Sequence, residues 1–99
     1  QLAAPDTKGR PEAVRLIARA SALLGQGDIG AARIVLERAS DTGSARANFM
    51  LAETYDPAVL AAWGTYGTRS EVTKARDLYA RAHAGGIQEA RNRLNALPQ

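Results

Sequence analysis

Apolar residues recur along this chain at the three- and four-residue spacing of amphipathic helices. Five such stripes are present, and three of the four joints between them are short and contain glycine. Short joints favour antiparallel helical hairpins. The pattern therefore predicts an all-α chain with five main helices. Their stripes are Ala13, Leu16, Ile17, Ala20 and Leu24; Ile29, Ala32, Leu36 and Ala39; Ala47, Met50, Leu51 and Tyr55; Val72, Ala75, Tyr79 and Ala82; and Ile87, Ala90, Leu94 and Leu97.

Several helix ends are marked by residues with a specific local chemistry. Pro11 suits the first turn of the first helix, because its missing N–H group would have no partner there. Asp28, Ser44 and Ser70 each precede a stripe and are predicted N-caps, since a short side-chain oxygen can accept from a free N–H group. Gly43 is expected to end the second helix.

The periodic pattern breaks between residues 56 and 69. Asp56 and Pro57 can start a short helical turn that reaches Trp63, and the next five residues contain two glycines and are expected to form a loop. Tryptophan, tyrosine and arginine often dominate binding energy, so the candidate partner-binding residues of this insert are Trp63, Tyr66 and Arg69. The helical spacing of Trp63 after Val59 and Leu60 also fits packing between hairpins and leaves Tyr66 and Arg69 as the exposed pair.

The second and fourth stripes belong to an internal echo. Between positions 28 and 51, seven of 24 residues are identical to the residue 43 positions later. The matched residues include two Ala-Arg pairs, two Arg-Ala pairs and the glycines at 43 and 86. A fixed period of this size is typical of solenoids built from stacked helical hairpins.

Composition and charge narrow the function classes. The net charge is +3 and 11 of the 13 basic residues are arginine, which permits binding to acidic partners such as nucleic acid. The arginines are spread along the chain, however, and Asp77 with Arg81 and Glu89 with Arg93 have the spacing of ion pairs within one helix. No apolar run is long enough to span a membrane.

Nothing in the sequence points to catalysis or to a cofactor. Cysteine is absent and His83 is the only histidine, whereas a metal site or a catalytic triad needs several converging groups. Gly25, Gly27 and Gly30 match a dinucleotide-binding spacing, but that motif follows a strand and here it follows a predicted helix. We therefore expect no enzyme and no cofactor.

The segment from Gly27 through Ala32 to Ala39 resembles the second helix of a tetratricopeptide repeat. Lys74-Ala75, Tyr79, Arg81-Ala82 and either Gly85 or Gly86 occur in the order seen in the Sel-one-like repeat, a longer relative. The chain departs from that family in its long segment after Tyr55. The resemblance implies a short right-handed solenoid of about two and a half repeats. Residues 1–10 are polar and contain Pro5 and Gly9, so they are expected to form a linker. The expected helical-repeat domain spans 11–97, with hairpins at 11–43 and 44–86, the insert at 56–69 and a terminal helix at 87–97.

What the resemblance implies for function is a protein–protein interaction scaffold from a larger, bacterial-type protein. Such a scaffold holds a peptide or a partner surface on a concave wall, and the wall positions that carry over are Arg46, Phe49, Glu53 and Asn92. Phe49 lies off the apolar stripe of its helix, so it is either a binding anchor or packed against the insert or another copy. The alternatives are a nucleic-acid-binding helical domain and a structural cap or homodimerisation module without a ligand.

Overall fold

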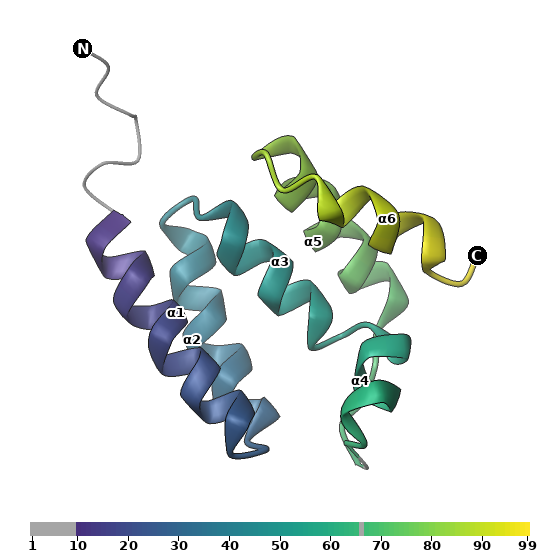
Figure 1. Ribbon diagram of the computed structural model, residues 1–99, viewed down its shortest axis with the longest axis horizontal. Coiled ribbons are helices and arrows are strands. Elements are labelled where there is room, and N and C mark those ends of the chain that lie inside the picture. Colours follow the sequence, from purple (N-terminus) through teal and green to yellow (C-terminus); the bar gives the residue numbers. More distant parts are fainter. Residues whose placement is uncertain (1–9, 66) are drawn as a thin grey trace.

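The computed structural model of the chain describes residues 10–65 and 67–99. Within these residues the chain forms six α-helices and no strand, so the predicted all-α class is confirmed (Figure 1). The fourth helix is the short turn expected within the insert. The helices are α1 (Arg10–Gly25), α2 (Ile29–Asp41), α3 (Ala45–Glu53), α4 (Pro57–Trp63), α5 (Val72–Ala84) and α6 (Glu89–Ala96).

Three of the helix starts carry side-chain N-caps. Asp28 accepts from the N–H group of Ala31, and Ser44 accepts from that of Ala47, as predicted. Asp56 caps α4 in the same way. The prediction that Ser70 caps the next helix is wrong.

The start of α5 is set by a tertiary contact. Its N-cap is Glu71, which makes no side-chain cap bond. The backbone N–H group of Glu71 donates instead to the carbonyl oxygen of Tyr55 at 2.9 Å. This bond ties the entry of α5 to the end of α3 and moves the helix start past Ser70.

Each long helix packs against the next long helix in the chain, with the short helix α4 left out of this series. α1 lies along α2, α3 lies against both α2 and α5, and α6 lies against α5 (Figure 1). α3 is therefore the central helix of the described chain, and six consecutive residues of it, 47–52, are buried. The turn between α1 and α2 and the short helix α4 lie at the same end of the molecule, the lower edge in Figure 1.

The 43-residue echo coincides with two helices of equal length. α2 and α5 are both 13 residues long and begin 43 residues apart. Alanine at these positions allows neighbouring helices to approach closely, and six echoed alanines have no exposed surface: Ala32, Ala39, Ala47, Ala75, Ala82 and Ala90. A close approach also occurs at Gly85, where an added Cβ atom would lie 2.5 Å from that of Ala45.

Candidate functional site

The wall positions predicted on α3 lie in two different environments. Arg46 is exposed, whereas only 2% of the surface of Phe49 is exposed. The Phe49 ring packs against the ring of Tyr79 from α5, with 5.5 Å between ring centroids. Arg46 and Arg93 lie over the same ring at 5.5 and 4.9 Å. Phe49 is therefore a core residue, so the sequence interpretation that places it off the core face is wrong, and its ring contacts include residues of α5 and α6.

Glu53, a third predicted wall residue, belongs to a polar network that links α3, α5 and α6. Arg93 donates to the carboxylate of Glu53 at 2.9 Å and to the hydroxyl of Tyr79 at 3.2 Å. The Tyr79 hydroxyl in turn donates to Asp56 at 2.7 Å. Asp56, only 3% exposed, thus caps α4 and also accepts a hydrogen bond from the Tyr79 hydroxyl.

Burial determines the protonation behaviour of this network. Burial raises the pKa of Glu53, and it outweighs the opposing effect of the paired Arg93. Burial and the hydrogen bond to Asp56 raise the pKa of Tyr79. Burial opposes ionisation of Arg93, but its hydrogen bonds to Tyr79 and Glu53 outweigh that effect and raise its pKa. At neutral pH Tyr79 therefore stays protonated and Arg93 stays charged.

The fourth wall residue, Asn92, lies apart from the others. It is exposed and lines a shallow polar depression with His83, Gln88, Glu89 and Arg91. The expected wall is thus divided between an internal network around Glu53 and a separate polar patch on α6. Only Arg46 and Asn92 of the four offer exposed side chains.

The insert places its predicted residues differently. Trp63 is the last residue of α4, and 41% of its surface is exposed. Arg69 is exposed, and its backbone carbonyl oxygen accepts a hydrogen bond from Arg33. Tyr66 lies outside the described residues.

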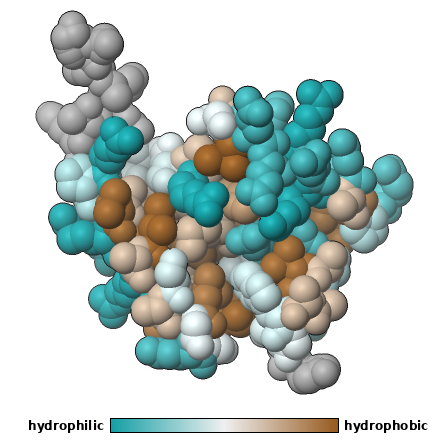
Figure 2. Space-filling view, viewed as in Figure 1, coloured by the Kyte–Doolittle hydropathy of each residue, from teal (hydrophilic) through white to brown (hydrophobic). Residues whose placement is uncertain are grey.

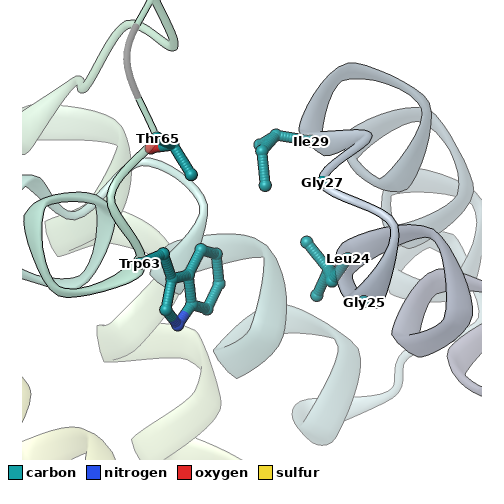
Figure 3. Close-up of a pocket in the computed structure, with 6 residues that line it drawn as sticks. All are labelled: Leu24, Gly25, Gly27, Ile29, Trp63 and Thr65. Atoms are coloured by element: carbon teal, nitrogen blue, oxygen red, sulfur yellow. The ribbon is translucent and has the colours of Figure 1, made fainter.

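Trp63 forms one wall of a pocket at the loop end of the molecule. The pocket has a volume of about 380 Å³ and is lined by Leu24, Gly25, Gly27, Ile29, Trp63 and Thr65. Figure 3 shows the Leu24 and Ile29 side chains pointing toward the insert, with the indole of Trp63 and the side chain of Thr65 opposite them. Two segments that are far apart in the sequence, the α1–α2 turn and the end of α4, thus line an open, mainly apolar hollow.

One arginine on α2 holds the insert next to this turn. The guanidinium of Arg33 lies 3.9 Å from the centre of the Tyr55 ring and donates to the carbonyl oxygen of Thr54 at the end of α3. It also donates to the carbonyl oxygen of Arg69 at 2.8 Å. Its echo partner, Arg76, donates to the carbonyl oxygen of Pro98, just beyond α6. Sequence reasoning did not assign Arg33 a role, although its place in the echo was a usable signal.

The two sides of the visible face differ in polarity. Figure 2 shows hydrophobic side chains among paler ones on the side of α1 and in the lower middle of the visible face, and hydrophilic side chains crowded over α6. Val14 on α1 is one of the large apolar side chains with substantial exposure, while Ile17 and Leu24 are partly buried. The Trp63 pocket therefore lies on the less polar side.

Other kinds of site lack support in the part of the chain that the structure describes. No group of three or more histidine, aspartate or glutamate side chains there could hold a metal ion. Nor does any described helix combine the length and apolar character needed to cross a membrane. Comparison of the chain with protein-family models, curated proteins and solved structures found no match.

Proposed function

We propose that this chain is a helical-repeat interaction module that binds a peptide segment of a partner protein. In this proposal α1–α2 and α3–α5 are two successive hairpins of a short solenoid, and α6 begins a third. The equal lengths of α2 and α5, their offset of 43 residues and their shared buried alanines support that arrangement. The resemblance to the Sel-one-like repeat, in turn, favours a binding role over a catalytic one.

The single observation that carries the proposal is the exposed Trp63 beside an apolar pocket. A large aromatic side chain left 41% exposed is a candidate anchor for binding, because burying it on association releases water from apolar surface. A volume of about 380 Å³ is within the usual range of binding pockets. The anchor of the proposed site is therefore the insert and not the α3 wall, where Phe49 and Glu53 already have partners.

A peptide-display selection on the immobilised chain tests this function. Peptides retained by the unchanged chain should be lost with Trp63→Ala, which removes the anchor. Ile34→Ala is the matched control, because Ile34 is also a large apolar residue with high exposure but lies on α2 outside the pocket. Thermal unfolding of both variants would establish that each remains folded.

The outcomes separate the competing functions. Peptides that require Trp63 and tolerate Ile34→Ala support the proposal. Peptides that require Arg46 but not Trp63 would move the site to the α3 wall and contradict it. A selection that retains no peptide, with binding only to nucleic acid that weakens steeply with salt, would favour the nucleic-acid alternative.

A further inference from the structure

The chain contains its own example of how a cation is held at a helix end. Thr54 is the C-cap of α3 and Tyr55 follows it. The guanidinium of Arg33 lies over the Tyr55 ring, 3.9 Å from the ring centre, and it donates to the Thr54 carbonyl oxygen. At the end of α3, the guanidinium of Arg33 thus contacts an aromatic ring and also donates to a carbonyl group at the negative end of the helix.

The end of α4 also has an aromatic side chain at a helix C-terminus, but no arginine lies over this ring in the described residues. Trp63 is the last helical residue, and Gly64 is the C-cap. Within residues 10–65 and 67–99, arginine or lysine groups lie over the rings of Phe49 and Tyr55 but not over Trp63. Tryptophan is the aromatic side chain that attracts cations most strongly.

The electrostatics of the pocket favour a positive charge. Among the residues that the structure describes, no charged side chain lines it. Its wall includes the last residues of two helices, Gly25 of α1 and Trp63 of α4, and the first residue of a third, Ile29 of α2. Helix C-termini carry partial negative charge and N-termini partial positive charge, and the positive end of α2 is capped by the carboxylate of Asp28. The exposed carboxylate of Asp28 lies in the chain between two lining residues, Gly27 and Ile29. The net charge of +3 acts weakly here, because salt screens charges beyond about 8 Å.

We propose that the Trp63 pocket takes an arginine side chain from the bound segment of the partner protein. The guanidinium stacks on the indole and donates to carbonyl groups at the helix ends, and the aliphatic part of the arginine contacts Leu24 and Ile29. Arginine suits the site better than lysine, because its planar group is more weakly hydrated and stacks on aromatic rings. The inference rests on the proposed peptide-binding function and specifies the ligand.

Four blocked pentapeptides that differ only in the central residue test this specificity. The central residue is arginine, its neutral isostere citrulline, lysine or leucine. Trp63 is the only tryptophan, so its fluorescence reports on the pocket directly. Amide chemical shifts of Gly27 and Thr65 provide a second readout. The arginine peptide should bind about tenfold more tightly than the citrulline peptide, a difference that lies between those expected from an exposed and from a desolvated cation–π contact.

The results distinguish failure of the inference from failure of the function. If the leucine or citrulline peptide binds as tightly as the arginine peptide, the pocket binds peptides but the arginine assignment is wrong. If a peptide from the display selection binds at Trp63 without any arginine, the same conclusion holds. If no peptide changes the Trp63 fluorescence or the amide shifts, both proposals fail. If the Trp63 fluorescence changed with protein concentration in the absence of peptide, a second copy of the chain would be the occupant of the pocket. That result would overturn the assignment to a partner protein.

A charge-neutral variant supplies an independent test. Asp28→Asn removes the charge but keeps an efficient N-cap, so the start of α2 should stay intact. We expect the affinity for the arginine peptide to fall roughly threefold and the affinity for the leucine peptide to stay unchanged. Asp41→Asn is the matched control, since Asp41 is an exposed carboxylate at the opposite end of α2 and should have no effect. Equal effects of the two variants would contradict a local role of Asp28.

Discussion

α2 and α5 occupy equivalent places in the sequence echo, but the large side chain that each buries has different contacts. Both helices carry alanines with no exposed surface at the same two positions, and each has one large, fully buried side chain between them. In α2 this side chain is Leu36, which offers only apolar contact. In α5 it is Tyr79, whose hydroxyl donates to Asp56 and accepts from Arg93.

The difference arises from what surrounds each helix. The insert brings the buried carboxylate of Asp56 next to α5, and α6 brings Arg93. A buried carboxylate needs hydrogen-bond partners, so a tyrosine fits at this position where a leucine would leave polar atoms without them. The two helices thus keep the same buried alanines, while the type of the large residue between them depends on the polar groups that lie next to it.

The largest expected effect comes from removing the carboxylate that distinguishes the second unit. Asp56→Ala removes the cap of α4 and leaves the buried Tyr79 hydroxyl without its acceptor. We expect a loss of about 3 kcal/mol in the free energy of unfolding. Asp28→Ala, which removes only an exposed cap from the first unit, should lose about 1 kcal/mol. Urea unfolding measures both, and equal losses would show that the Tyr79 bond contributes nothing.

The next effect separates the two echoed arginines. Arg33→Ala removes a stacked guanidinium that joins the end of α3 to the insert, and we expect a loss of about 2 kcal/mol. Because the insert carries Trp63, the fluorescence spectrum of Trp63 should also change. Arg76→Ala is the control, since Arg76 binds only the carbonyl oxygen of Pro98 and lies on the exposed side of α5. If Arg76→Ala also altered the Trp63 spectrum, the effect would not be specific to the contacts that Arg33 makes with the end of α3 and the insert.

The smallest effect concerns pH. Burial raises the pKa of Glu53, so the folded chain binds that proton more tightly than the unfolded chain does. The contribution of Glu53 to stability is then greatest below its unfolded pKa and falls as the pH rises through its folded pKa. Glu53→Gln removes this titration. Relative to the Gln variant, the unchanged chain should lose less than about 1 kcal/mol between about pH 4 and about pH 7.

Urea unfolding of both proteins at the two pH values measures that difference. Glu37→Gln is the control, because Glu37 is an exposed carboxylate on α2. A gain in the stability of the unchanged chain relative to Glu53→Gln as pH rises would show that the ion pair with Arg93 outweighs burial.

Much of the helix layout could be predicted from local sequence. The alanine and leucine stripes gave the buried faces of α2, α3 and α5, because a 3.6-residue period leaves only one side of a helix for the core. The caps at Asp28 and Ser44 were also predictable, since each acts within three residues of its own position. Ser70 failed as a cap because a bond between Glu71 and distant Tyr55 sets the start of α5.

The helical class and most helix boundaries follow from the sequence alone, because they depend on contacts between near neighbours in the chain. The sequence also marks the helix faces that carry the alanines, while the packing of other helices against those faces buries them. The burial of Phe49 depends on the tertiary structure. This residue lies off the apolar stripe of its helix, but Tyr79 and Arg93 from two other helices cover it. The tertiary structure also decided the pocket at Trp63, because Leu24 and Ile29 come from another hairpin. Periodicity assigns a residue to a face of its own helix, whereas burial and pockets depend on which distant segments meet that face.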